Sequence, residues 1–85
     1  MEADLVLIEW EDSRQPSSAW RRVSSLEPAS AVRCKTVGWL IEDGDVVVVA
    51  QNLGDTDADD PQVSGVMAIP RRCIIRRRRL AAARR

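Results

Sequence analysis

The sequence contains no histidine, and this absence excludes several classes of active site. Histidine is the usual general base at neutral pH, the partner of serine and cysteine nucleophiles, and the commonest metal ligand. Neither a Cys-x-x-Cys pair nor a glycine-rich phosphate-binding motif is present, so zinc-ribbon, redox and nucleotide sites do not fit. Carboxylates alone could support acid–base chemistry, but here they cluster in predicted turns. We therefore expect a protein that is not an enzyme, with no cofactor, no metal and no small-molecule substrate.

Cysteine and long apolar runs are also scarce. The two cysteines, Cys34 and Cys73, lie far apart in the sequence, and residues 1–4 are acidic where a secretory signal would be basic. We therefore expect a reducing cytoplasm, in which both thiols are free and buried as small apolar groups. No apolar run reaches the roughly 18 residues needed to cross a bilayer, so we expect no membrane span.

Charge is distributed unevenly, although the formal net charge of the chain is zero. Residues 1–70 hold all 13 acidic residues and five basic ones, a net charge of −8, whereas residues 71–85 hold eight arginines and no acid. An acidic body and a basic C-terminal segment can attract each other or bind separate partners. The aromatic residues are three tryptophans, and the many valines and isoleucines favour strands.

Short β-branched runs separated by turn residues predict a domain made mostly of strands. The predicted strands cover residues 5–10, 32–42, 46–50 and 62–69, and a brief fifth strand opens at Ile74 and runs into residues 76–79. Pro70 ends the fourth strand because proline lacks the backbone donor that a ladder needs. Residues 71–73 then form a tight turn or one turn of 3₁₀ helix.

Two features in the middle of the chain predict local geometry. The Asp43-Gly44 pair between two β-branched runs predicts a β-hairpin with a type I′ turn, which requires positive φ at both central residues. Gly38 inside the second predicted strand indicates a bulge or a sharp bend. Trp39 is expected in the core, and Trp10 is expected to pack beside the first strand.

Two long connections lack a regular apolar period. Residues 11–31 contain several serines and the isolated Trp20, and we expect an ordered loop, with one helical turn at 19–23, that Trp20 pins as a lid over one open end of the core. Residues 52–61 form an acidic loop that begins with the aspartate spacing of an EF-hand. The glycine, the glutamate and the flanking helices of an EF-hand are missing, so we expect a solvated loop.

Five short strands with a tight turn before the last predict a mainly β fold. The expected architecture is a small five-stranded SH3-like or Sm-like barrel, whose closure would remove the exposed edges of a valine-rich sheet. An open α+β roll is the alternative. The predicted barrel domain covers residues 1–76, and residues 77–85 are expected to form a flexible arginine-rich tail.

Four short segments carry a resemblance to a group of proteins. They are Trp10-Glu11-Asp12-Ser13, Val37-Gly38-Trp39-Leu40, Ala50-Gln51-Asn52, and Ile69-Pro70-Arg71 through Ile74. With these segments the chain resembles small uncharacterised phage and prophage proteins over residues 5–80. The resemblance implies a small barrel made in the cytoplasm of a bacterial host during phage growth. It brings no catalytic residue, and the arginine-rich tail is not part of the group's pattern.

The arginine-rich segment is a candidate binding site for RNA or DNA. Arginines placed on phosphates release counterions, which gives salt-sensitive affinity, and a segment of alanine, leucine and arginine can fold on such a partner. The candidate nucleic-acid-binding residues are Arg71, Arg72, Arg76, Arg77, Arg78, Arg79, Arg84 and Arg85. The alternative is that the segment is disordered or folds back on the acidic body of its own or a neighbouring chain.

Trp20 is the candidate protein-binding residue. Exposed tryptophans are enriched at interaction hot spots, and anchoring of its own loop is the competing interpretation. The first functional hypothesis is therefore a non-catalytic interaction or assembly module. A chain this short buries a modest core, so a homo-oligomer is a natural way to bury more surface. The alternative hypothesis is a nucleic-acid-binding accessory protein.

Overall fold

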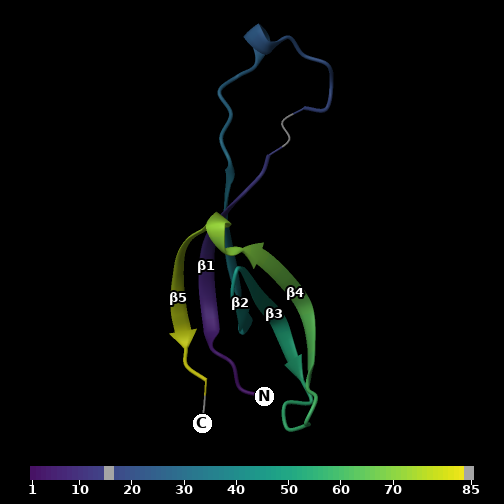
Figure 1. Cartoon of the computed structure of the whole chain (residues 1–85), viewed down its shortest axis with the longest axis vertical. Helices are drawn as coiled ribbons and strands as arrows, with labels where there is room; N and C mark the ends of the chain where they lie inside the picture. The colour runs from purple at the N-terminus through teal and green to yellow at the C-terminus, as the bar shows by residue number, and fades with distance from the viewer. Residues whose placement is uncertain (15–16, 84–85) are drawn as a thin grey trace.

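The computed structural model describes residues 1–14 and 17–83 and shows a single antiparallel sheet. The described residues form five strands, two short 3₁₀ turns and no α-helix. The strands are β1 (Leu5–Asp12), β2 (Val32–Asp43), β3 (Val46–Gly54), β4 (Gln62–Pro70) and β5 (Ile74–Ala81), and the turns are η1 (Val23–Ser25) and η2 (Arg71–Cys73). The strand order is β4-β3-β2-β1-β5, so β1 lies between β2 and β5 (Figure 1).

The prediction of a mainly β fold with five strands is confirmed, and each strand ends later than predicted. The largest difference is at β3, which continues to Gly54. The strand β5 continues to Ala81 and pairs with β1 from Leu5 to Trp10. The predicted start of a flexible tail at residue 77 therefore falls inside a paired strand. β1 offers a free edge along these residues, and backbone pairing to it satisfies the polar groups of β5 whatever its side chains are. Arg84 and Arg85 lie outside the described residues.

The sheet is open, and the predicted closure into a barrel is not found. Across residues 1–14 and 17–83, β4 pairs with β3 alone and β5 pairs with β1 alone, so these two strands form the edges. η2 joins the two edges in sequence, as expected for residues 71–73. After this single turn, β5 pairs with β1 and not with β4 (Figure 1).

The edge strand β4 has an uncharged sequence and an interruption in its ladder. Val63, Val66 and Met67 are exposed on it. Gly65 has a φ of 64° and is not among the residues paired with β3, although Ser64 and Val66 on either side of it are paired. A residue other than glycine adopts this left-handed conformation only with strain. The backbone of β4 is therefore kinked at Gly65.

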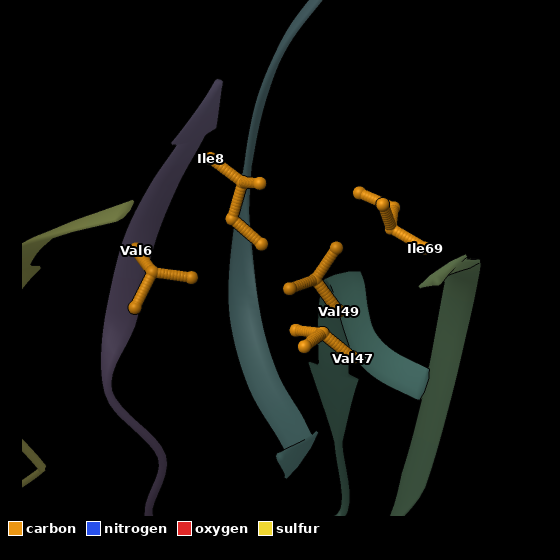
Figure 2. Packing of buried hydrophobic residues seen from close by; sticks show 5 residues of the cluster. All are labelled: Val6, Ile8, Val47, Val49 and Ile69. Atoms are coloured by element: carbon orange, nitrogen blue, oxygen red, sulfur yellow. The ribbon is translucent and has the colours of Figure 1, made fainter. Parts of the chain in front are cut away.

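The core lies on one face of the sheet, between β1 and the β3–β4 pair. Alternate residues of a strand point to the same face, so every second side chain of β1 and of β3 contributes to the core. The buried side chains that pack together are Val6, Ile8, Val47, Val49 and Ile69, each at most 2% exposed (Figure 2). The half-buried side chains packed against them are Trp10, Leu40, Cys73 and Ile74. Trp10 thus lies beside the first strand as predicted.

Gly38 permits a close approach between β2 and β3. A Cβ atom at this position would lie 3.0 Å from both the Ala50 carbonyl oxygen and the Val49 Cβ. The sequence predicted a bulge or a sharp bend at Gly38, whereas the register shift between β2 and β3 falls between Leu40 and Glu42. The glycine is therefore needed for space, and the irregularity it indicated lies slightly further along the strand.

The β2–β3 hairpin is confirmed, whereas its predicted turn type is wrong. Among the described residues, positive φ is found only at Asp55 and Gly65, so neither Asp43 nor Gly44 has the type I′ conformation. Asp43 pairs with Val47, which leaves three residues in the connection. Arg71 holds this longer turn, because its Nε donates to the Gly44 carbonyl at 2.7 Å.

The described residues between β1 and β2, which are 13, 14 and 17–31, lie in an arm that projects from the sheet at one end of the molecule (Figure 1). The prediction that this segment covers the core as a lid is wrong, as is the position of its helical turn, since η1 lies at Val23–Ser25 rather than at 19–23. The side chains that pack against the core beside β1 and η2 are instead those of Trp10, Cys73 and Ile74. The arm contributes to a long molecule of 58 × 22 × 18 Å.

We predict that Gly38→Ala lowers the free energy of unfolding by about 1–3 kcal/mol, because the added methyl group overpacks the contact with β3. Urea denaturation followed by tryptophan fluorescence measures the change. Gly44→Ala is the matched control, since nothing lies within 4 Å of a Cβ atom there, and we expect its effect to stay within about 0.5 kcal/mol. Equal effects of the two substitutions would contradict the role assigned to Gly38.

Candidate functional site

The strand conformation of β5 divides the arginines between two faces of the sheet. Arg77 pairs with Ile8 and Arg79 with Val6, so both lie on the core side of the sheet. Arg76 pairs with Glu9 and Arg78 with Leu7, and both lie on the opposite side, which we call the outer face. The four arginines of β5, which the sequence suggested as part of one cluster, therefore do not share a single face.

Arg71 and Arg77 bind the same carboxylate, that of Asp43 at the end of β2. Arg77 donates to both oxygens, Oδ1 and Oδ2, at 2.9 Å each, and an Nη of Arg71 donates to Oδ1. The hydrogen bonds from Arg77, with those from Arg71, lower the pKa of Asp43 from 3.8 to about 2, although partial burial opposes the shift. The same pairing raises the pKa of Arg77. We call this group the Asp43 clamp.

On the outer face, Glu9 lies between two cations. Its Oε2 accepts a hydrogen bond from Arg76 Nε at 2.5 Å, and its Oε1 lies 3.7 Å from Lys35 Nζ. The pKa of Glu9 is lowered, chiefly by the hydrogen bond from Arg76. Both cations remain about three-quarters exposed, so they stay accessible to a partner.

A shallow hollow of about 440 Å³ adjoins this group. Leu7 supplies apolar lining, and Arg78 joins Lys35 and Arg76 around it. Within residues 1–14 and 17–83, no acidic group lies within ion-pair distance of Arg72, Arg78 or Arg79. The arginine-rich segment therefore pairs with the acidic body through Arg71, Arg76 and Arg77, as the sequence predicted for the segment as a whole.

Trp20 is fully exposed on the arm, at 102% of its reference surface. Val23 and Leu26 follow it at 85% and 62%. Among the described residues, this part of the arm makes local hydrogen bonds, from Ser25 N to the Arg22 carbonyl at 2.9 Å and from Leu26 N to the Val23 carbonyl at 3.2 Å. The interpretation of Trp20 as the anchor of its own loop is therefore wrong.

A second hollow, of about 480 Å³, lies at the end of the sheet opposite the arm, and the sequence did not predict it. Trp39, Leu53, Ala81 and Ala82 supply apolar lining, and Glu2 is also part of it. The expectation that Trp39 belongs to the core is wrong. The signal was present in the alternation of β2, because Gly38 faces Val49 and the core, and its neighbour in a strand must point the other way.

The remaining predicted features carry no chemistry beyond local structure. In the part of the chain that the structure describes, no group of three or more His, Cys, Asp or Glu side chains is arranged to hold a metal. In the acidic loop, Asp55 accepts a hydrogen bond from Gln62 Nε2 at 3.3 Å. Cys34 and Cys73 are free thiols, and both are half-buried rather than fully buried. Trp10 Nε1 donates to Thr36 Oγ1 at 2.9 Å.

Comparisons of the chain with protein-family models, with curated proteins and with solved structures find no match. The resemblance to phage and prophage proteins therefore stays a prediction. No helix among residues 1–14 and 17–83 has both the length and the apolar character needed to cross a membrane. The surfaces described above are consequently the basis for any functional conclusion.

We predict that the Asp43 clamp stabilises the fold in a pH-dependent way. The pKa of Asp43 is about 2 in the folded protein, below the value near 3.9 in the unfolded chain. The stabilisation is therefore complete above about pH 5 and is lost as the pH falls towards 2. Asp43→Asn should lower the free energy of unfolding by about 1 kcal/mol at pH 7, a modest loss because the groups are partly exposed.

Urea denaturation of both proteins at pH 7 and at pH 2.5 or below tests this prediction. The difference between wild type and Asp43→Asn should shrink at the lower pH. Asp45→Asn is the matched control, because Asp45 contributes its backbone carbonyl to the turn through the hydrogen bond from Arg71 N at 2.9 Å. A difference that is independent of pH would show that the clamp does not act through the charge of Asp43.

Proposed function

We propose that this protein is a non-catalytic interaction module that docks through its arm. The observation that carries the proposal is the complete exposure of Trp20, together with the exposure of Val23 and Leu26, on a segment that projects from the sheet. Tryptophan is among the residues most enriched at binding hot spots, and clustered exposed apolar side chains mark interaction sites.

The energetics of the arm support a docking role. Burial of a Val or Leu side chain contributes about 1.5–3 kcal/mol, and a tryptophan buries more area. The arm already contains the η1 turn, which reduces the ordering cost that docking a fully disordered segment would incur. The absence of histidine and of nucleotide or metal motifs in the sequence supports a role without catalysis.

We also propose that the fold is a variant of the small SH3-like or Sm-like barrel in which the last pairing is missing. The strand order β4-β3-β2-β1-β5 and the 3₁₀ turn between β4 and β5 support this assignment. The core between β1 and the β3–β4 pair indicates that the sheet bends around its apolar face. Origin in a phage or prophage and a place in the bacterial cytoplasm are part of the same proposal and rest on the sequence resemblance.

We predict that Trp20→Ala removes association without affecting the fold. The free energy of unfolding should change by less than about 0.5 kcal/mol, because the side chain is fully exposed. Chemical cross-linking of the full chain, alone and in a bacterial extract, measures association, and the yield of cross-linked species should fall at least tenfold. Val37→Ala on the outer face is the matched control, since Val37 is also exposed. Unchanged cross-linking of Trp20→Ala in both settings would overturn the proposal.

A second candidate function is nucleic-acid binding through the outer face. The observation that favours it is the hollow at which Lys35, Arg76 and Arg78 surround Leu7, with Glu9 as the single acidic group lining it. A row of exposed cations over apolar sheet surface suits a phosphate backbone, whereas the arginines of the Asp43 clamp are occupied.

We predict that Arg78→Gln weakens binding of single-stranded RNA or DNA and lowers the slope of log K against log salt by about 0.7–1, as expected for the loss of one phosphate contact. Fluorescence anisotropy across a salt series measures the slope. Arg72→Gln is the matched control, because Arg72 lies on η2 and not on the outer face. Equal slopes for the two variants, or no binding by wild type at low salt, would exclude this candidate.

A further inference from the structure

We infer that the arm of one copy docks into the Trp39 hollow of a second copy, so that copies of the chain associate head to tail. This inference rests on the proposed docking role of the arm and names its partner. The two surfaces are the exposed Trp20 segment of the arm and the hollow of about 480 Å³ lined by Trp39, Leu53 and Ala81. Its volume falls within the roughly 300–1,000 Å³ of sites that enclose small organic groups.

The two surfaces have opposite charge. Residues 13–31 carry three arginines and one glutamate, and Arg21 and Arg22 directly follow Trp20. At the hollow, the N-terminal ammonium of Met1 donates to the Thr56 carbonyl, and Glu2 is part of the lining. The connection at residues 55–60 next to Leu53 carries four aspartates and no basic residue, so carboxylates outnumber this ammonium. An apolar side chain flanked by cations therefore meets an apolar hollow flanked by anions, which favours correct encounter and disfavours arm-to-arm contact.

The positions of the two surfaces favour contact between copies. The arm lies at one end of the long axis, and the N-terminus, the end of β5 and the β3–β4 connection lie at the other (Figure 1). The hollow belongs to this second end, because Met1, Leu53 and Ala82 are among its lining residues. Two different patches at opposite ends form a heterologous interface, which generates rings or open chains rather than a simple twofold dimer.

Charge reversal at each surface provides the test. The arm variant combines Arg21→Glu and Arg22→Glu, and the hollow variant combines Asp57→Lys and Asp59→Lys, all at exposed positions where the fold should be unaffected. Analytical ultracentrifugation of the wild-type chain at low salt should show mass that rises with concentration. Each variant alone should associate at least tenfold more weakly, because like charges then face each other.

Two further samples distinguish this interface from general stickiness. An equimolar mixture of the arm variant and the wild-type chain should form shorter assemblies, because the variant can accept an arm but cannot donate one. A chain carrying all four reversals should associate again, because the charges are once more complementary. Circular dichroism of every variant confirms that the sheet is retained.

The outcomes separate this inference from the proposed function. A wild-type chain that stays monomeric at all concentrations, or a fourfold variant that does not recover association, overturns the head-to-tail interface. If the head-to-tail interface is overturned in this way but Trp20→Ala still abolishes cross-linking in bacterial extract, the docking role of the arm stands and its partner is another protein. If Trp20→Ala changes neither measurement, both proposals fail.

Discussion

The pairing of Asp43 with two arginines connects parts of the sheet that are not neighbours in it. β1 separates β2 from β5 in the sheet, yet Arg77 of β5 binds the carboxylate at the end of β2 through two bonds of 2.9 Å. Arg71 adds η2 to the same carboxylate and also donates to the carbonyl of Gly44. One anion thus connects the β2–β3 turn, the turn after β4 and the last strand. The clamp therefore adds a link between these elements to the apolar packing of β1 against β3 and β4.

This use of arginine explains how a neutral chain can be so unevenly charged along its sequence. Arg71, Arg76 and Arg77 neutralise carboxylates of β1 and β2, so part of the basic segment is structural. Among the described residues, the charges that remain for partners include the cations of the outer face, the basic arm and the acidic connection between β3 and β4. The arm and the acidic end carry opposite charge and are set apart along a long molecule, which is the basis of the proposed head-to-tail contact.

The sequence predicted those features that depend on local pattern. The β-branched runs placed all five strands, and Pro70 with the following residues placed η2, because strand propensity and the missing proline donor act locally. The Asp43-Gly44 pair placed the hairpin. Its turn type was wrong because Asp43 and Gly44 are held by Arg71, which is distant in sequence. Local preference gave way there to a tertiary contact.

Features that depend on long-range packing were not predictable in the same way. The segment at 77–81 resembled a solvated tail because it is dense in arginine, and only the free edge of β1 makes it a strand. Trp20 resembled a loop anchor, but the side chains that pack against the core beside β1 and η2 are those of Trp10, Cys73 and Ile74. Trp39 is the exception, since the alternation of β2 contained enough information to place it on the outer face. The large apolar side chain of Trp39 suggested a place in the core, although its position in the alternation of β2 indicated the opposite face.

The kink in β4 has a consequence for the solubility of the chain. β4 is nine residues long, has no charge and forms an edge of the sheet, which is the composition to which further strands add in fibrils. At Gly65 the backbone leaves the extended conformation and divides this edge into two stretches, both shorter than the about six residues of a steric zipper. A side chain in its place would meet Gln51 Oε1 at 2.6 Å, so the interruption depends on glycine. A single residue without a side chain thus removes from this edge the continuous stretch on which further strands could add.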